Sequence, residues 1–242
     1  GCQKSGDAIT FVREMEHLDF VGAVEWLANR LGIALRYTDS SDGTNRKERQ
    51  ELSDLLEKTA EFYHQTLRSG KQAGKVRSYL RSRGFDSETV EQFRIGYAPD
   101  EWDALASHLG VATEKLEAAG LGRPGQRGGA IDFFRDRVMF PVCDANGVVV
   151  GFGGRMLPDG QQPKYKNTPH TRLYDKSKVL YGLHWAKKQI VHADEIIVCE
   201  GYTDVIGCFR AGLDRAVATC GTALTDEHVK TMVRFAKRIV IA

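Results

Sequence analysis

The sequence has no apolar run long enough to span a bilayer, and neither end resembles a secretory signal peptide. We therefore expect a cytoplasmic protein with no membrane partner. The chain also lacks a GxxxxGKS loop, which argues against a P-loop ATPase, and it has no internal repeat or low-complexity tract. Its 242 residues leave room for one large domain or for two ordinary ones with real cores.

Cysteine is scarce, and its spacing is uninformative for metal or redox motifs. The five cysteines include no C-x-x-C pair, and a disulfide framework is not expected in a chain of this size without a secretory signal. Cys143, Cys199, Cys208 and Cys220 are predicted to be small buried hydrophobic residues. A catalytic cysteine at Cys199 or Cys220 is the alternative, but no histidine and acid partners stand at recognisable positions.

Net charge is small as well. Thirty-four basic residues against 32 acidic ones leave +2, so nucleic-acid binding cannot be argued from the total charge. The segment from Arg155 to Lys178 nevertheless carries six basic residues and two acidic ones. Basic side chains interleaved with Tyr165, Tyr174 and Tyr181 suit a groove that follows a single strand and stacks its bases. The alternative for each tyrosine is a place in the core beneath a solvated loop.

The most informative stretch runs from Glu195 to Gly212, EIIVCEGYTDVIGCFRAG. Its pattern predicts a buried parallel strand that ends at Glu200, a turn at Gly201 and a helix that opens at Asp204. Functional groups gather at the carboxyl ends of strands in open α/β sheets, so Glu200 and Asp204 are placed to face one bound cation. Alternatively, both carboxylates only complement the helix dipole, which explains Asp204 but leaves Glu200 incidental.

The rest of the C-terminal region repeats this pattern. Residues 216–219 predict a second strand, 225–236 a helix capped by Thr225, and 238–242 the beginning of a third strand. This alternation predicts right-handed crossovers and a parallel sheet. We expect the chain to stop inside the third strand, just before the next position at which a functional group would stand.

Several motifs resemble a known family. EGYTDV, followed by AVATCGTALTDEHV and an apolar strand, resembles the start of a Toprim domain, the metal-dependent catalytic module of bacterial primases and topoisomerases. Other segments resemble the RNA-polymerase core of the bacterial replicative DNA primase: FRIGYAP from Phe93, FRDRVMFPV from Phe134, GFGGRML from Gly151, PKYKNTP from Pro163 and LYDKSKVLYGL from Leu173. The resemblance covers nearly the whole chain in the order of the family, and this order makes it far more specific than any one motif.

The resemblance implies a nucleotidyltransferase that makes short RNA primers on a single-stranded DNA template from ribonucleoside triphosphates, with a replicative helicase as partner in a primosome. A ribose hydroxyl attacks an α-phosphate and pyrophosphate leaves, while Mg²⁺ or Mn²⁺ stabilises both reacting oxygens. The resemblance also implies that Glu200 and Asp204 are the catalytic metal ligands. The basic motif positions assigned to template or nucleotide contact are Arg94, Arg137, Arg155, Lys164 and Lys176.

The first residues resemble the last part of the primase zinc-binding domain, in which the position of Cys2 supplies the final Zn²⁺ ligand. Structural zinc takes four ligands, so we expect Cys2 to bind it in the intact protein together with partners that would precede it. Cys2 alone should hold no structural zinc.

We predict four parts along the chain: a zinc-domain remnant at 1–36, a linker at 37–46, the N-terminal subdomain of the primase catalytic core at 47–192 and a partial Toprim domain at 193–242. The expected fold class is α+β and α/β. A helical and mixed polymerase subdomain should precede a truncated, Rossmann-like parallel βαβαβ Toprim unit.

Inside the predicted core subdomain, helices are expected at 46–69 and, as short segments, up to Leu116. RVMFPVCDANGVVVGFGG predicts two strands joined by a hairpin at Asn146 and Gly147. The glycines Gly151, Gly153 and Gly154 allow a phosphate or another backbone to come close, and tight strand packing explains them equally well.

Two other functions are compatible with parts of this pattern. A different Toprim enzyme, a topoisomerase or nuclease, would need a nucleophilic tyrosine or another companion domain, and PKYKNTP and LYDKSK argue against it. The second alternative function is that of a module that only binds single-stranded DNA. The further acidic positions of the family, a DxD-like pair and another acid, are expected beyond residue 242, so we predict that this chain alone is inactive.

Overall fold

The computed structural model describes residues 6–16, 20–33, 35, 40–126, 128–160 and 162–242, so Cys2 lies outside the described residues. The chain divides into two compact units, Gly1–Lys47 and Glu48–Ala242. No helix in the described ranges is long and apolar enough to cross a membrane. The two units are treated separately below.

The first unit contains α1 (Ala8–Glu16) and α2 (Phe20–Leu31), and α3 (Ser40–Ser69) begins in it. Small and branched side chains form its interior, with Val12 of α1 and Ala23 of α2 both buried. The predicted linker needs a correction, because its residues 40–46 are helical. Once the strong helix formers that follow have nucleated a helix, adding further residues costs little, and this outweighs the turn-rich composition.

The second unit begins with a helical layer. After α3 come η1 (Lys71–Ala73), α4 (Gly74–Ser82), α5 (Ser87–Gln92), α6 (Ala104–Leu109) and α7 (Thr113–Ala118). The apolar stripe of α3 is buried as its spacing predicts, with Leu56 and Tyr63 almost fully enclosed. Asp86 begins α5 by accepting a hydrogen bond from the Thr89 amide at 2.8 Å.

An antiparallel sheet with the order β1-β4-β5-β6 forms the centre of this unit. Its strands are β1 (Gly96–Ala98), β4 (Arg137–Cys143), β5 (Val149–Met156) and β6 (Tyr165–Asn167), and β2 (Gly122–Pro124) and β3 (Ala130–Asp132) form a separate pair. The predicted hairpin is confirmed, with Gly147 at a φ of 87° and the Asp144 amide bonded to the Val148 carbonyl. The sequence analysis did not predict β1, β2 or β3, which have only three residues each.

The C-terminal sheet has the order β10-β8-β9-β7. It comprises β7 (Leu180–Tyr181), β8 (Glu195–Cys199), β9 (Ala216–Thr219) and β10 (Arg238–Ile241), joined through α8 (Leu183–Ala193), α9 (Tyr202–Arg210) and α10 (Asp226–Met232). β8 is parallel to both β9 and β10, which confirms the predicted parallel sheet, and β7 adds an antiparallel edge. α10 ends at Met232, four residues before the predicted position.

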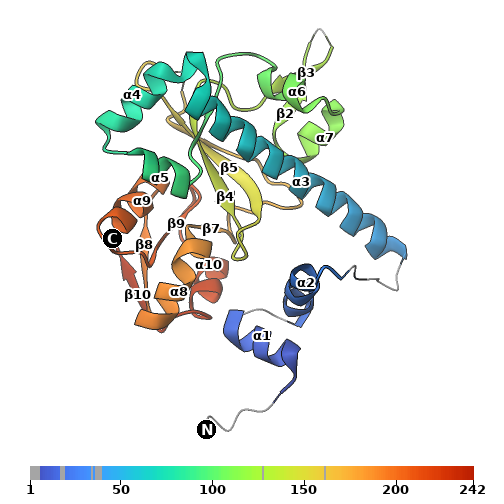
Figure 1. The fold of residues 1–242 in the computed structure, drawn as a ribbon, viewed down its shortest axis with the longest axis vertical. Helices are drawn as coiled ribbons and strands as arrows, with labels where there is room; N and C mark the ends of the chain where they lie inside the picture. The colour runs from blue at the N-terminus through green and yellow to red at the C-terminus, as the bar shows by residue number, and fades with distance from the viewer. Residues whose placement is uncertain (1–5, 17–19, 34, 36–39, 127, 161) are drawn as a thin grey trace. The chain divides into compact units, whose positions relative to one another are not determined.

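Helices cover both faces of the C-terminal sheet (Figure 1). α8 and α10 share one apolar cluster with Ile196, Val198 and Val217. α9 lies on the other face, where Val205 and Ile206 join Ile197 in a cluster that also includes Val138 and Phe140 of β4. One continuous core therefore joins the two sheets through α9, which confirms the combined α+β and α/β fold.

The tightest contact in this core lies between β5 and α9. A Cβ added at Gly153 would lie 2.3 Å from Cε2 of Tyr202, closer than real Cβ atoms approach any neighbour. Comparable contacts exist at Gly151 with Tyr174 and at Gly154 with Phe134. Tight packing, the second of the two explanations offered for these glycines, is therefore what the structure shows.

This contact predicts that Gly153→Ala destabilises the second unit by about 2 kcal/mol or more, because β5 and α9 cannot both keep their positions. Urea unfolding followed by circular dichroism measures the change. Gly207→Ala is the matched control: Gly207 lies inside α9 with nothing within 4 Å of an added Cβ. It should stabilise the protein by up to about 1 kcal/mol. Equal stabilities of the two variants would contradict the packing described here.

Candidate functional site

The predicted metal ligands stand at the carboxyl end of β8. Glu200 follows the last residue of β8 and is exposed, and in the described part of the chain it has neither an ion pair nor a hydrogen bond. Asp204 is also exposed, but its Oδ2 accepts a hydrogen bond from the Gly201 amide at 3.0 Å. Asp204 thus caps its own helix, as the alternative interpretation requires, whereas Glu200 has no such role.

The chemistry of this edge fits a hydrated divalent cation. Magnesium prefers carboxylate oxygens, keeps several waters, and often takes only one or two protein ligands. The carboxyl ends of the parallel strands β8, β9 and β10 meet at the same edge, so Glu200 lies beside the loop that follows Thr219. Among the residues that the structure describes, no group of three or more His, Cys, Asp or Glu side chains is placed to hold a metal ion.

Tyr202 fixes the backbone next to Glu200. Its ring is 3% exposed, stacks on Phe140 with centroids 5.5 Å apart, and meets the edge of Tyr181 at 4.7 Å. Its hydroxyl donates to Oδ1 of Asn167 at 2.9 Å. Burial raises the pKa of the Tyr202 hydroxyl well above its usual value, so it acts as a hydrogen-bond donor and not as an acid at neutral pH.

Asn167 is the functional-site residue that the sequence analysis missed. While its Oδ1 accepts from Tyr202, its Nδ2 donates to the Cys220 carbonyl at 2.8 Å. One amide of β6 therefore binds both the first turn of α9 and the loop after β9. The only sequence signal was its position inside the PKYKNTP motif.

Two of the three tyrosines that were expected to stack bases are core residues. Tyr174 is 1% exposed and Tyr181 is 0% exposed, so that expectation is wrong for both and the core alternative holds. Tyr165 is half-buried, and its hydroxyl accepts a hydrogen bond from Arg155 Nη1 at 2.7 Å.

Cysteine chemistry is not available at this site. Burial raises the pKa of the Cys199 thiol to about 12 and that of Cys220 to about 11. Both thiols are therefore protonated at neutral pH, and a thiol is a far weaker nucleophile than a thiolate. Cys143, Cys199 and Cys220 are buried as predicted, whereas Cys208 is only half-buried.

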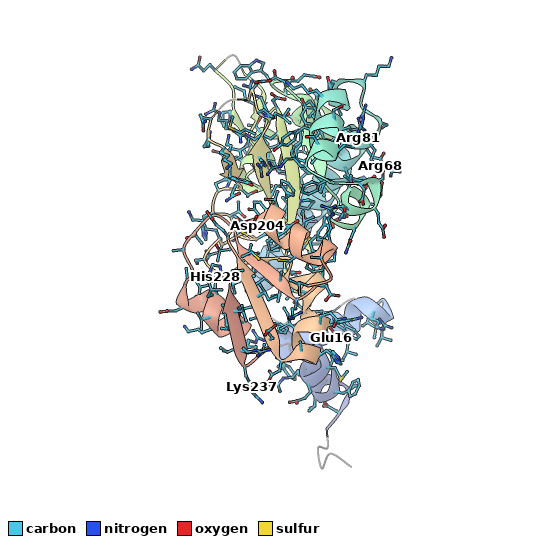
Figure 2. All side chains as sticks on the ribbon, turned by 90° about the vertical axis from the view of Figure 1, so that its left-hand side faces the viewer. Glu16, Arg68, Arg81, Asp204, His228 and Lys237 are labelled. Carbon is cyan, nitrogen blue, oxygen red and sulfur yellow. The ribbon has the colours of Figure 1, made fainter. Side chains whose placement is uncertain are left out.

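The predicted basic residues do not form one groove. Arg155 lines a small crevice together with Thr203 of the first turn of α9, and Lys164 is exposed beside it, with Nζ 6.0 Å from the Tyr165 ring. Lys176 is exposed in the loop before β7. Arg155 is thus placed beside the first turn of α9, where Figure 2 labels Asp204.

Arg137 and Arg94 have structural partners. Arg137 is 5% exposed, and its Nη1 donates to the carbonyls of Gly154 and Pro163. Arg94 forms an ion pair with Glu57 of α3 at 2.6 Å. The Arg137 guanidinium therefore holds β5 and the following loop in place, and its assignment to template or nucleotide contact stays a prediction.

A second basic surface lies on the opposite face of β6. Side chains alternate along a strand, so Lys166 points away from its neighbours Tyr165 and Asn167. Its Nζ donates to the Phe133 carbonyl at 2.5 Å and lies 3.7 Å from the centre of the Phe133 ring. Burial, together with the nearby guanidinium groups of Arg137, Arg123 and Arg135, lowers the pKa of Lys166 to about 8.

Trp102 provides an aromatic surface close to these groups. Its side chain is 61% exposed, and the Arg135 guanidinium lies 3.4 Å from the ring centre. Trp102 and Arg123 line an open groove that runs between α6–α7 and the β2–β3 pair. Exposed aromatic and cationic groups in one groove are typical of sites that bind single-stranded nucleic acid.

The fold and the site together define a class of protein: a parallel α/β sheet with an exposed carboxylate at its edge, joined to a mixed subdomain that carries basic residues. Residues 62–187 match the family model described as the DNA primase catalytic core, N-terminal domain. Residues 194–242 match the Toprim domain, and residues 1–43 match the CHC2 zinc finger. The chain therefore belongs to the DNA primase family.

Curated relatives agree with this assignment. The chain is 45% identical over 240 residues to a DNA primase of Streptomyces coelicolor, covering 97% of this chain and 37% of the relative. It is 43% identical over 242 residues to a DNA primase of Mycolicibacterium smegmatis, covering 97% of this chain and 38% of the relative. The chain thus spans somewhat more than a third of these relatives.

Solved structures show the same fold. The RNA polymerase domain of the Mycobacterium tuberculosis primase DnaG has a TM-score of 0.75 and 40% identity, over 80% of this chain and 66% of that chain. The zinc-binding and RNA polymerase domains of the Aquifex aeolicus primase have a TM-score of 0.74 and 32% identity, over 100% of this chain and 58% of that chain.

The Asn167 bridge can be tested by removing one hydroxyl. Tyr202→Phe keeps the ring stacking but leaves Oδ1 of a partly buried amide without its donor, so we expect a loss of about 1 kcal/mol in the free energy of unfolding. Tyr165→Phe is the control, because the Tyr165 hydroxyl is bonded to a guanidinium that solvent also reaches. Urea unfolding compares the two variants, and equal small losses would mean that the bridge contributes nothing to stability.

Proposed function

We propose that this chain is the portion of a DNA primase that positions the template and the first catalytic carboxylate for synthesis of short RNA primers from ribonucleoside triphosphates. The observation that carries the proposal is the exposed, unpartnered Glu200 at the edge of the parallel sheet, one short turn from the Arg155 crevice. A carboxylate on that edge has no role in stability among its described neighbours and is available to a cation.

In this proposal Glu200 is the first Mg²⁺ or Mn²⁺ ligand, and Asp204 assists through the oxygen that does not cap α9. The bound cation would stabilise the attacking ribose oxygen and the leaving pyrophosphate oxygen. The chain's own contribution is to hold Glu200 in place through Tyr202 and Asn167 and to supply positive charge through Arg155. Zn²⁺ binding through Cys2 and further ligands is proposed from the match to the CHC2 zinc finger.

The template path that we propose crosses the edge of the central sheet at β6. A DnaG primase catalytic domain that is 36% identical to this chain, with a TM-score of 0.75, is known bound to single-stranded DNA. β6 is the edge strand, so a nucleic-acid strand passing over it reaches Arg155 on one face and Lys166 on the other, with Lys164 just before the strand. Arg135 and Trp102 would then contact the next nucleotides. Lys176 lies in an exposed loop, and its contact with the template or nucleotide stays a prediction.

The remaining partners are proposed from the family alone. Ribonucleoside triphosphates would enter at the Glu200 edge, and a replicative helicase would recruit the protein in the cytoplasm. No described residue is assigned to the helicase contact. Because no three His, Cys, Asp or Glu side chains in the described ranges are grouped to hold a metal ion, we propose that two-ion catalysis requires additional acidic groups.

The β6 path predicts that removing basic charge at or near β6 weakens binding to single-stranded DNA. We expect about a tenfold loss of affinity in each of two double variants, Arg155→Ala/Lys164→Ala and Arg135→Ala/Lys166→Ala. The slope of the logarithm of the binding constant against the logarithm of the salt concentration should fall by about 0.7 per lost phosphate contact. Fluorescence anisotropy with a labelled oligonucleotide measures both quantities. The control is Lys188→Ala/Lys237→Ala, which removes two exposed charges from α8 and the residue before β10. If the control weakens binding as much as the two test variants do, the charge effect is non-specific and the β6 path is wrong.

Lys166 should also make binding depend on pH. Its pKa of about 8 means that the ammonium group loses its proton as pH rises from 7 to 9, and the attraction to phosphate is lost with it. Affinity for single-stranded DNA should therefore fall over this range. Lys166→Arg, which stays charged, should remove the effect. A pH profile identical in the wild type and the arginine variant would exclude Lys166 from the interface.

Catalysis is tested in a primase that contains this chain and the remainder of the catalytic core. Glu200→Gln should lower primer synthesis by at least about a hundredfold while leaving stability and template affinity nearly unchanged. Asp204→Asn keeps an oxygen that accepts from the Gly201 amide and removes only the charge, so its loss of activity measures the metal role of Asp204 apart from its capping role. Near-normal synthesis by Glu200→Gln would place the catalytic centre elsewhere and favour a module that only binds DNA.

A further inference from the structure

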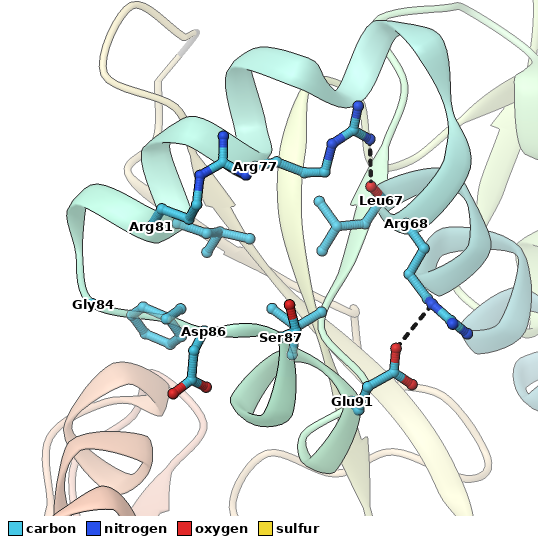
Figure 3. Close-up of a pocket in the computed structure, with 11 residues that line it drawn as sticks. Leu67, Arg68, Arg77, Arg81, Gly84, Asp86, Ser87 and Glu91 are labelled. Atoms are coloured by element: carbon cyan, nitrogen blue, oxygen red, sulfur yellow. Dashed lines mark hydrogen bonds and ion pairs between the residues drawn. The ribbon is translucent and has the colours of Figure 1, made fainter.

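A pocket lies between the C-terminal end of α3, α4 and α5, next to the Arg155 crevice and distinct from it (Figure 3). Its volume is about 560 Å³, within the range of about 300–1,000 Å³ that small-molecule sites occupy. None of the residues assigned to the template or the metal lines it.

The floor of the pocket is apolar and rigid. Leu67, Leu80 and Phe85 line it, and all three belong to the main core cluster, with Val90 packed against the same cluster. A floor that is part of the core keeps its shape without a ligand, which lowers the entropy lost on binding. Such a surface accepts a compact apolar body such as an aromatic ring.

The rim carries positive charge that no described residue neutralises. Arg77 and Arg81 lie one turn apart on α4, and neither forms an ion pair within the described ranges. Arg77 Nη1 donates to the carbonyls of Leu67 and Gly70, at 2.7 and 3.0 Å, which fixes its guanidinium at the rim. Arg81 Nη2 makes a single long contact of 3.2 Å with Ser78 Oγ.

The two carboxylates at the rim are already engaged elsewhere. Asp86 accepts a hydrogen bond from the Thr89 amide and caps α5. Glu91 lies between Arg68, at 2.8 Å, and His64, at 3.2 Å. Arg68, Arg77 and Arg81 against Asp86 and Glu91 leave the lining a net charge of +1, so the mouth attracts an anion at Arg77 and Arg81.

We propose that this pocket binds a small anion with an apolar body: the flat body rests on Leu80, Phe85 and Val90, and its phosphate or carboxylate group binds Arg81 and Arg77. A guanidinium pairs with either oxyanion through two parallel N–H donors. The ligand is thus a nucleoside monophosphate or an aromatic carboxylate. The proposal does not rest on the proposed primer synthesis, and the pocket borders the Arg155 crevice, with which it shares Leu80 and Phe85.

Amide chemical shifts of the ¹⁵N-labelled protein test the proposal, with AMP, adenosine and benzoate as probes. AMP should shift amides of α4 and α5, and adenosine, which lacks the phosphate, should bind about tenfold more weakly or not at all. Arg81→Ala should weaken AMP binding by about tenfold, a change of about 1.4 kcal/mol. Lys75→Ala is the matched control, because Lys75 is an exposed cation on the same helix and does not line the pocket.

Val90→Trp provides an independent test by filling the floor, with circular dichroism to verify folding. If it does not fold, Val90→Met fills part of the floor with a milder change. AMP shifts that depend on Arg81 identify a nucleotide site, and benzoate shifts with the same dependence identify a carboxylate site. The proposal is overturned if neither anion shifts these amides, or if Arg81→Ala and the filled variant bind as the wild type does.

Discussion

The arrangement of the second unit depends on the packing of Tyr202 against β5. Gly153 leaves no room for a Cβ beneath the Tyr202 ring, and Phe140 stacks on that ring. Asn167 accepts a hydrogen bond from the Tyr202 hydroxyl. The ring belongs to the first turn of α9, and α9 belongs to the parallel sheet, so this one contact fixes the two sheets relative to each other. Interiors this dense tolerate few alternative arrangements, because any added volume forces the backbone to move.

Glu200 derives its position from that contact. It lies two residues before Tyr202, at the end of a strand whose own residues are all buried, so its backbone has little freedom while its carboxylate stays in solvent. Arg155 approaches the same helical turn from β5, two residues after Gly153. Packing in the core therefore brings a free carboxylate and a guanidinium to one place from segments about 45 residues apart in the sequence.

The C-terminal sheet was predictable from the sequence because its strands are apolar runs bounded by clear caps and glycines, as at Thr225 and Gly212. The strands β1 and β7 were not predictable, because a segment of two or three residues shows no periodicity. Only pairing with other strands in the folded protein defines β1 and β7. The segment from Arg155 to Lys178 was predicted to form one basic groove, yet the alternation of β6 places Lys166 and Arg155 on opposite faces of the sheet. Partners such as Asn167 to Cys220, 53 residues apart, leave no local pattern to read.

Native-state hydrogen exchange tests most directly whether Tyr202 makes the two sheets one cooperative unit. If it does, the slowest amides of β5 and β8 exchange only through a shared opening, with the same free energy and the same denaturant dependence. If the amides of β8 and β9 exchange at a lower free energy and with a smaller denaturant dependence than those of β4 and β5, the sheets open separately. The position of Glu200 would then not be set by the packing of Tyr202 on β5.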